Sequence, residues 1–419
     1  MHDIYFVRTD CRGCGFENLR TVASLAPMAI ATPNFDVPDN DRDHPVYRAG
    51  VPLELSLCDD CGLLQVLHIG NPEIQYPNYV YETNHSLGLV EHFRTYADDV
   101  AAEIGNVSGG KVIEIGSNDG TLLGFFKDRG MTPLGIDPAE NIARKATDNG
   151  IPTIVAFFGE ETAKRVLNEH GPGDLIIANN VIANVDDLNG FFAGVKVLLS
   201  ESGRFVFETQ YGADVIERLL LDTIYHEHLT YMNIRPIIAL AERNGLKVVD
   251  VKRIDTKGGS IRVTVMHDNA GRQPAPVVAE MVAQEYENGH YGEDLYSGFR
   301  QRIEDVKTQL RELVAETRAA GKQVAGYGVS VGTCVLMPTF GLDQEIDYLF
   351  DDNPIRGDRF SGPGYDIPIH MGDELAKMAP GIVILFAWRY AKQIMEKNQG
   401  YIESHGKFVV PLPSLVIHS

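Results

Sequence analysis

Hydrophobic runs alternate with amphipathic patterns from about residue 110 onward, and this rhythm predicts the fold of the middle of the chain. Short apolar runs bounded by glycine, proline or an acid indicate buried strands. Between them, apolar residues recur at helical spacing. Strands that alternate with helices form a parallel sheet with helices on both faces, so we expect an α/β, doubly wound fold. The expected strands are 112–115, 133–137, 152–156, 174–178 and 205–208, with helices over 122–127 and 142–149.

The pattern differs on either side of this region. Short strands and turns are expected in the first 75 residues, and a helix is expected to start near Ser86. Two strands joined through Lys257-Gly-Gly259 predict an antiparallel pair, and a charged helical stretch runs from 277 to about 319. A second, smaller α/β pattern follows. We therefore predict three domains: 1–75, 76–275 and 276–419. The antiparallel strands are 247–254 and 260–267, and the later ones are 323–328, 346–351 and 381–386.

Length and charge narrow the functional classes. A chain of 419 residues is too long for one ordinary domain. The net charge of −21 argues against nucleic-acid binding, which needs a basic surface. The same charge suits a cationic ligand, whereas a phosphate-bearing substrate would need a local basic pocket. Solubility alone is the plainer explanation of the acidity.

Targeting signals and membrane spans are not expected. The first residues lack a basic segment followed by an apolar run, and no stretch reaches the length of a membrane span. Four of the five cysteines fall in two CxxC pairs, so we expect metal ligands rather than disulfides. A reducing, cytoplasmic location and a monomeric chain are the corresponding expectations.

The two CxxC pairs predict a zinc site with four cysteine ligands. Two residues between cysteines let both sulfurs face one metal ion, and two such turns complete a tetrahedral shell. A complete protein shell leaves no open position, so the zinc would be structural. Buried or redox-active cysteines are the alternative. The proposed ligands are Cys11, Cys14, Cys58 and Cys61.

The turn after the first expected strand predicts a site for S-adenosylmethionine (SAM). Its glycines let the backbone approach a ligand closely, at the strand ends where open α/β sheets bind ligands. The order differs from GxGxxG, which speaks against NAD. An acid at the end of the second strand can hold ribose hydroxyls, although an ordinary turn and a solvent-facing acid remain the simpler reading. The candidate cofactor residues are Glu114, Gly116, Ser117, Asn118, Asp119, Gly120, Asp137, Pro138, Asn179 and Asn180.

A third cluster, Tyr225-His226-Glu227-His228, contains candidate acid–base groups. Two histidines flanking a glutamate could bind a metal, but they would share one side only on a strand and would diverge on a turn. Methylation of carbon offers another reading, because a proton next to a carbonyl must first be removed, and histidine does this near neutral pH. A tyrosine or acid can orient the base or the enolate. A hydrogen-bonded structural histidine is the plainer alternative.

These motifs together resemble the three-domain SAM-dependent sugar C-methyltransferases, which act on nucleotide-linked 4-keto sugars and make branched antibiotic deoxysugars. The resemblance covers essentially the whole chain. It implies an N-terminal zinc-binding module, a class I methyltransferase core and a C-terminal Rossmann-like domain that helps to bind the substrate. The segments that carry it are Cys11–Gly15, Cys58–Gln65, Val112–Gly120, Asn179–Val181, Asp222–His228, Lys257–Ser260 and Asp351–Gly357.

The resemblance also implies roles for individual residues. The last histidine of the third cluster, His228, corresponds to the catalytic base, and Tyr225 and Glu227 line the same site. Tyrosines just before the core reach the sugar, and Tyr79 or Tyr81 match them.

Two positions depart from the family pattern. Asn184 stands where the family commonly has a histidine near the substrate, and the run 329–334 lacks the usual lysine-containing turn. These departures put the identity of the sugar and of the attacked carbon in doubt, but leave the combination of a base with SAM intact. The leading hypothesis is a C-methyltransferase acting on a nucleotide-linked keto sugar. Its rivals are methylation of another enolisable or hydroxyl acceptor, and a scaffold that binds SAM without turnover.

Overall fold

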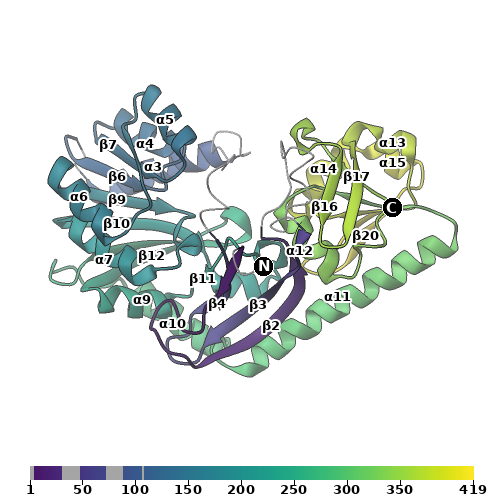
Figure 1. Ribbon diagram of the computed structural model, residues 1–419, viewed down its shortest axis with the longest axis horizontal. Coiled ribbons are helices and arrows are strands. Elements are labelled where there is room, and N and C mark those ends of the chain that lie inside the picture. The colour runs from purple at the N-terminus through teal and green to yellow at the C-terminus, as the bar shows by residue number, and fades with distance from the viewer. Residues whose placement is uncertain (1–3, 31–47, 72–87, 106–107) are drawn as a thin grey trace.

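The computed structural model describes residues 4–30, 48–71, 88–105 and 108–419. Figure 1 shows two α/β units on either side of the molecule, with strands of the N-terminal region between them. None of the described helices is long and apolar enough to cross a membrane.

A seven-stranded sheet forms the centre of the first unit, in the order β12-β13-β10-β9-β6-β7-β8. Strands β6 to β10 pair in parallel, whereas β13 lies antiparallel to both of its neighbours. When the seven strands are renumbered along the chain and read from the β8 edge, the order is 3-2-1-4-5-7-6. This is the order of class I methyltransferases, so the predicted fold is confirmed. The strands are β6 (Lys111–Ile115), β7 (Thr132–Asp137), β8 (Thr153–Val155), β9 (Gly173–Asn179), β10 (Leu199–Gln210), β12 (Leu246–Ile254) and β13 (Ser260–His267).

Helices cover both faces of this sheet because successive side chains of a strand point to opposite faces. Val112 packs with α3 and α4, whereas its neighbour Ile113 packs with α7 and α9 on the other face. The helices and short turns of the unit are α3 (Leu89–Ile104), α4 (Thr121–Asp128), α5 (Glu140–Asp148), α6 (Glu160–His170), η2 (Ile182–Asn184), α7 (Leu188–Leu198), α8 (Gly212–Glu217), η3 (Leu221–Thr223), α9 (Ile234–Arg243) and η4 (Thr256–Gly258).

The N-terminal region forms two small sheets. Strand β1 (Tyr5–Val7) pairs with β5 (His68–Gly70), and a four-stranded sheet has the order β11-β4-β3-β2. Its fourth strand, β11 (Thr230–Tyr231), comes from the methyltransferase unit, directly after the predicted catalytic cluster. The N-terminal sheet is therefore completed by the chain that carries the site. Its remaining strands are β2 (Leu19–Met28), β3 (Val51–Cys58) and β4 (Leu64–Val66).

The charged stretch after residue 275 is two helices rather than one. Helix α10 (Pro276–Glu287) packs against α9 and β12, and α11 (Glu293–Ala319) continues along the second unit, as Figure 1 shows. Gly289, with φ of 78°, lies between them in the left-handed conformation that favours glycine. Helix α10 follows residue 275 but packs on the first sheet, so it belongs by its contacts to the first unit. The predicted domain boundary at 275 stays a prediction.

The second unit has a seven-stranded sheet in the order β16-β17-β15-β14-β18-β19-β20, parallel in its middle and antiparallel at both edges. One hydrophobic core links this sheet, α11, the N-terminal sheet and α8. Its other elements are β14 (Val324–Tyr327), α12 (Val331–Thr339), β15 (Tyr348–Asp351), η5 (Pro354–Arg356), β16 (Arg359–Gly362), β17 (Tyr365–Met371), η6 (Gly372–Glu374), α13 (Leu375–Met378), β18 (Ile382–Leu385), η7 (Trp388–Tyr390), α14 (Ala391–Lys397), α15 (Gln399–Glu403), β19 (Phe408–Val410) and β20 (Val416–His418).

Candidate active site and metal centre

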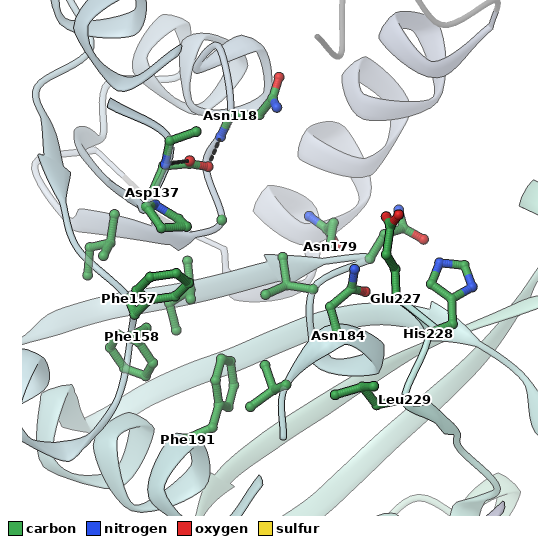
Figure 2. A pocket seen from close by; sticks show the side chains of 18 of the residues that line it. Asn118, Asp137, Phe157, Phe158, Asn179, Asn184, Phe191, Glu227, His228 and Leu229 are labelled. Carbon is green, nitrogen blue, oxygen red and sulfur yellow. Dashed lines mark hydrogen bonds between the residues drawn. The ribbon is translucent and has the colours of Figure 1, made fainter. Parts of the chain in front are cut away.

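A cavity of about 690 Å³ opens at the carboxyl ends of β6, β7 and β9. This is the switch point of the sheet, where the strand order reverses between β6 and β9. In Figure 2, Asn118 and Asp137 lie at one end of the view and Glu227 and His228 at the other, with Asn179 and Asn184 between them. Apart from Asp119 and Gly120, the predicted cofactor residues therefore share one cavity with the predicted catalytic residues.

The turn after β6 is shaped by close packing against the loop after β9. Gly116 has φ of 68°, and a Cβ atom there would lie 2.4 Å from a methyl carbon of Val181. Only glycine fits this position without displacing the neighbouring loop. Gly120 and Asp119 follow at the start of α4, where the Asp119 carboxylate accepts hydrogen bonds from the Thr121 amide and hydroxyl. They lie outside the cavity lining, and their predicted cofactor role stays a prediction.

Asp137 ends β7 and is held in place by backbone amides. One carboxylate oxygen accepts from the Asn118 amide at 2.8 Å and the other from the Ala139 amide at 2.9 Å. Each oxygen keeps a second lone pair. The Asp137 carboxylate faces the cavity next to Pro138 and can still accept hydrogen bonds from ligand hydroxyls.

Unpaired polar atoms gather at this end of the cavity. Glu114 is 3% exposed, and one of its carboxylate oxygens has no hydrogen-bond partner. Burial raises the pKa of Glu114 well above its usual value, and the charges of Asp119 and Asp137 add to this effect. The Ser117 hydroxyl is also buried without a partner. A cationic ligand with hydrogen-bonding groups, such as SAM, fits these residues.

Three asparagines line the middle of the cavity. The Asn179 amide oxygen accepts from the Glu208 backbone at 3.1 Å, while its amide nitrogen is buried without a partner. Asn180 adopts φ of 57°, a left-handed conformation that asparagine tolerates. The Asn184 side-chain oxygen is likewise buried without a partner. Asn179 and Asn184 therefore each leave one hydrogen-bonding atom for a ligand.

His228 is fixed by two hydrogen bonds on a turn after η3. Its Nδ1 donates to the Thr223 carbonyl at 2.9 Å, and its Nε2 accepts from the Tyr225 hydroxyl at 2.8 Å. A carbonyl only accepts, so the proton of the neutral ring is on Nδ1 and the lone pair is on Nε2. Burial lowers the pKa of His228 to about 3, and the charges of Lys257 and Arg389 act in the same direction. The imidazole is neutral near pH 7 and can accept a proton.

His226 diverges from His228, as expected for a turn. Its Nδ1 donates to the His68 carbonyl of β5 at 3.1 Å, and burial lowers its pKa to about 4. The two histidines do not combine into a metal site: among the described residues, only the four paired cysteines bring three or more His, Cys, Asp or Glu ligand atoms together.

Glu227 lies between the two histidines and also lines the cavity. Burial raises its pKa to about 7. The carboxyl can therefore be either protonated or ionised near neutral pH.

Several residues that line the cavity were not predicted from the sequence. Phe157 and Phe158 follow β8 and, with Phe191 of α7, form an aromatic wall near Asp137 (Figure 2). Two adjacent phenylalanines directly after a strand end were the available signal. Lys257 was expected in a hairpin turn and in a segment that carries the family resemblance, with no role of its own at the site, yet it lines the cavity. Tyr79 and Tyr81 lie outside the described residues.

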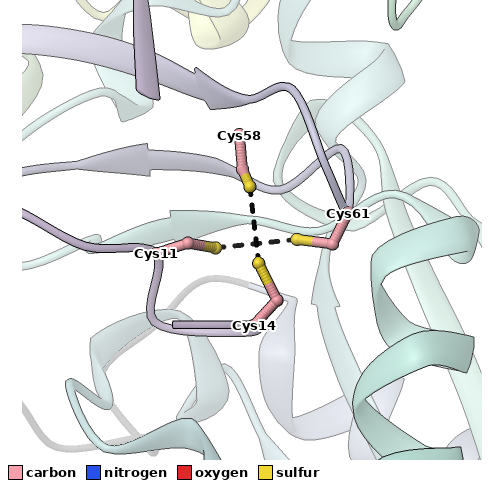
Figure 3. Close-up of side chains that lie close together, drawn as sticks. All are labelled: Cys11, Cys14, Cys58 and Cys61. Atoms are coloured by element: carbon pink, nitrogen blue, oxygen red, sulfur yellow. Dashed lines mark hydrogen bonds between the residues drawn. The ribbon is translucent and has the colours of Figure 1, made fainter. Parts of the chain in front are cut away.

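The four paired cysteines converge on one point in Figure 3. Their sulfur atoms lie within 4.8 Å of one another, with Cys11 and Cys61 3.6 Å apart and Cys14 and Cys58 3.5 Å apart. A tetrahedral zinc ion with Zn–S bonds of about 2.3 Å requires sulfurs about 3.8 Å apart. All four side chains are buried. The donor set and its spacing fit a structural zinc ion.

An ion pair connects the cysteine cluster to a residue that lines the cavity. Arg12, between two of the cysteines, is 1% exposed, and its guanidinium lies 2.9 Å from the Asp186 carboxylate. Asp186 lines the cavity, as do Phe6, Ile69 and Gly70 of the N-terminal region. The N-terminal module therefore forms part of the active-site wall.

Comparison with known proteins agrees with this arrangement. Family profiles match residues 11–76 as a zinc-binding domain, 89–251 as a methyltransferase domain and 255–413 as a C-methyltransferase C-terminal domain. The chain is 33% identical to C-methyltransferase NovU of Streptomyces niveus over 414 residues, which cover 99% of this chain and 97% of NovU. The chain belongs to the C-methyltransferase family. This C-methyltransferase uses SAM as methyl donor and carries a zinc-binding module.

The chain is also similar to solved structures over less than half of its length. The PH0226 protein of Pyrococcus horikoshii is 17% identical, with a TM-score of 0.38 over 45% of this chain and 94% of its own. Magnesium protoporphyrin IX methyltransferase of Synechocystis, solved with bound SAM, is 13% identical, with a TM-score of 0.33 over 43% of this chain and 85% of its own. These TM-scores are too low to assign a fold. The fold of the C-methyltransferase is therefore assigned from its own strand order.

Proposed function

We propose that the enzyme methylates the carbon next to the ketone of a nucleotide-linked keto sugar. The observation that carries this proposal is the His228 imidazole, a neutral base with its lone pair on Nε2, in the same cavity as the predicted SAM residues. A scaffold that only binds SAM needs no such base, whereas methylation of a carbon next to a ketone requires removal of the proton on that carbon.

The predicted cofactor residues Asn118 and Asp137 lie at the end of the cavity opposite the base, and Asn179 lies between the two ends. Asp137 would accept hydrogen bonds from the ribose hydroxyls, and the aromatic wall at Phe158 would cover the adenine. Glu114 and Asn179 would meet the polar and cationic groups of the cofactor with their unpaired atoms. When bound, SAM supplies an electrophilic methyl group.

His228 performs the acid–base step. The bond between the α-carbon and its hydrogen breaks, the proton passes to Nε2, and the electron pair forms the carbon–carbon double bond of an enolate. The Tyr225 hydroxyl, which donates to Nε2 at 2.8 Å, orients the ring and must turn its proton away as the substrate approaches. The hydrogen bond from Nδ1 to Thr223 stabilises the imidazolium that forms.

The resemblance to the family and the charge beside the base both support a nucleotide-linked sugar as the substrate. The chain carries a net charge of −21, yet Lys257 and Arg389 place positive charge beside the base. This positive charge favours entry of an anionic, nucleotide-linked substrate into the cavity. Asn184 contributes a neutral amide where the family commonly has histidine. The acceptor sugar would therefore differ from the family's usual substrate in the group that contacts Asn184.

The decisive test replaces the base. His228→Asn should bind SAM with unchanged affinity but lose methyl transfer by roughly 10²–10⁴-fold, the usual contribution of a positioned base. It should also lose exchange of the α-proton into D₂O without SAM, followed by NMR on a panel of nucleoside-diphosphate 4-keto sugars. His226→Asn is the matched control and should be milder, because its ring bonds to the His68 carbonyl.

Two results would contradict the assignment. If His226→Asn is the inactive variant and His228→Asn is active, the base is His226. If both variants keep methyl transfer, the acceptor is already nucleophilic, and methylation of a hydroxyl or another enolisable acceptor replaces the present proposal.

A further inference from the structure

The turn that joins β12 to β13 holds Lys257 in an unusual backbone conformation. Lys257 has φ of 54°, in the left-handed region, and is followed by Gly258 and Gly259 with φ of 88° and 147°. A left-handed conformation is unfavourable for a residue with a side chain. Such strain persists only where the surroundings enforce it, and it is concentrated at functional sites.

Two arginines from different elements enforce this conformation. Arg389 of η7, in the C-terminal unit, donates to the Lys257 carbonyl at 2.6 Å, and Arg218 after α8 donates to the Gly258 carbonyl at 2.9 Å. A Cβ atom on Gly259 would lie 2.4 Å from the Asp214 carboxylate, so the turn also packs tightly on α8. The backbone of Lys257 is therefore fixed from two sides.

The Lys257 side chain lines the same cavity as Tyr225, Glu227 and His228. Within the described part of the chain, its ammonium group makes no hydrogen bond or ion pair. Desolvation lowers its pKa to about 8, and the charge of Arg389 contributes, so the group is mostly protonated at pH 7. Lys257 thus places a positive charge at the cavity, and no partner of its ammonium group is found among the described residues.

The positive charge of Lys257 makes it harder for His228 to accept a proton, unless a negative charge lies near both groups. After proton removal, His228 is an imidazolium, which burial and the positive charges of Lys257 and Arg389 disfavour. A negative charge that develops beside both groups reverses this effect. The enolate oxygen is the one negative charge that the reaction itself creates.

We propose that Lys257 is a catalytic residue whose ammonium group donates a hydrogen bond to the ketone oxygen as that oxygen becomes the enolate. This rests on the proposed function, because it names the partner of the proton removal by His228. As the C–H bond breaks and its proton passes to Nε2, the former carbonyl π pair moves onto the oxygen, which Lys257 meets. No covalent bond to Lys257 forms, and its proton stays on nitrogen.

Other ionisable groups surround the pair and share its electrostatics. Arg389 contacts the Asp222 carboxylate, and Glu208 of β10 acts on Lys257 and is bound by His92 and Arg262. Any change in pH therefore reaches Lys257 through several neighbours, so the tests compare variants at one pH as well as across pH. The groups that face His228 and Lys257 are Glu208, Asp222, Tyr225, Glu227 and Arg389.

Binding of a substrate phosphate is the rival role for this lysine. A phosphate contact would hold substrate and transition state equally, so its loss would raise KM and leave the rate at saturation unchanged. A contact to the enolate oxygen exists only after proton removal begins, so its loss lowers the rate at saturation. We favour the enolate because the charge of Lys257 acts directly on the base.

The first experiment measures SAM-independent exchange of the α-proton of thymidine diphosphate 4-keto-6-deoxyglucose. Lys257→Met should lower the saturated rate by about 10²–10³-fold, the usual loss when an oxyanion donor is removed. Lys257→Arg should retain more activity and should keep it above pH 8, where the wild-type lysine deprotonates. Lys252→Met is the matched control, because Lys252 lies in the same hairpin but pairs with Asp99.

The second experiment needs no reacting substrate. NMR titration of His228 should give a higher pKa in Lys257→Met than in the wild type or in Lys252→Met; an unchanged pKa overturns the proposal. Calorimetry with thymidine diphosphate gives the other decisive outcome: a loss of affinity in Lys257→Met with an unchanged exchange rate assigns the lysine to phosphate. If no wild-type exchange occurs with any keto sugar, the proposed function fails, while the titration still decides whether Lys257 acts on His228.

Discussion

Glu227 and His228 are adjacent residues whose pKa values move in opposite directions for the same reason. Burial disfavours the charged form of each, so it raises the pKa of Glu227 to about 7 and lowers that of His228 to about 3. At pH 7 His228 is therefore neutral, and Glu227 is about half protonated. The site can then receive the charges of the reaction without first displacing an ion pair.

Replacement of Glu227 should reveal its burial as a dependence of stability on pH. The folded protein keeps the Glu227 proton up to about pH 7, whereas the unfolded chain releases it near pH 4.5, so stability falls as pH rises between these values. Glu227→Gln cannot ionise. Its advantage over the wild type in thermal unfolding should grow from pH 5 to pH 8, by about 1–3 kcal/mol after allowance for partial exposure.

The control for this prediction is Glu201→Gln, since Glu201 is exposed on β10. Its difference from the wild type should be the same at both values of pH. An equal difference for Glu227→Gln at pH 5 and pH 8 would mean that Glu227 ionises as freely in the folded protein as in the unfolded chain.

At the scale of elements, the two cysteine turns organise the N-terminal strands. The Gly15 amide donates to the Cys11 carbonyl at 2.8 Å and the Gly62 amide to the Cys58 carbonyl at 2.9 Å, so each turn closes on itself. The second turn joins β3 to β4, and β4 pairs with β11. Loss of the metal would therefore also weaken the pairing of β11, the strand that follows the predicted catalytic turn.

We predict that a variant with Cys58→Ser and Cys61→Ser loses its zinc. Elemental analysis should give about one zinc per chain in the wild type and none in the variant. Because structural zinc contributes folding free energy, hydrogen exchange in β3 and β4 should also become faster. Cys334→Ser is the control, since Cys334 lies buried in α12, away from the cluster. Full zinc content in the double variant would refute the site.

Elements with a strong local pattern could be predicted from the sequence. The short apolar run that begins at Val112 marked β6, and the spacing of the cysteines marked the metal centre. Strand β11 could not be found, because two residues, Thr230 and Tyr231, carry no periodicity, and their pairing partner lies far away in the sequence. The role of Lys257 was hidden for the same reason: its neighbours at the site come from η3 and η7.

At the scale of the whole molecule, Arg389 connects the C-terminal unit to the active site. Its guanidinium contacts both the Asp222 carboxylate, which is 8% exposed, and the Lys257 carbonyl. Trp388 beside it packs on the core that the two units share. The C-terminal unit thus helps to set the shape of the cavity without lining it in the described structure.

Arg389→Met should leave Asp222 as a buried carboxylate without its cation. We expect a loss of about 1–3 kcal/mol in stability, below the usual value for a buried pair because Arg389 is partly exposed. Adding Asp222→Asn should recover most of this loss in denaturant unfolding. Arg165→Met, at an exposed position of α6, should have little effect. Strictly additive losses in the double variant would show that the two residues do not interact.

The pairing of β4 with β11 has a consequence for the order of synthesis. The ribosome completes β2, β3 and β4 about 160 residues before it reaches Thr230, and at typical elongation rates this interval lasts roughly ten to thirty seconds. During that time the growing chain presents β4 as an open strand edge, which invites wrong partners. The edge of β4 in the nascent enzyme is therefore covered only after β11 has been synthesised. Slower translation lengthens the time during which this edge can pair with another chain.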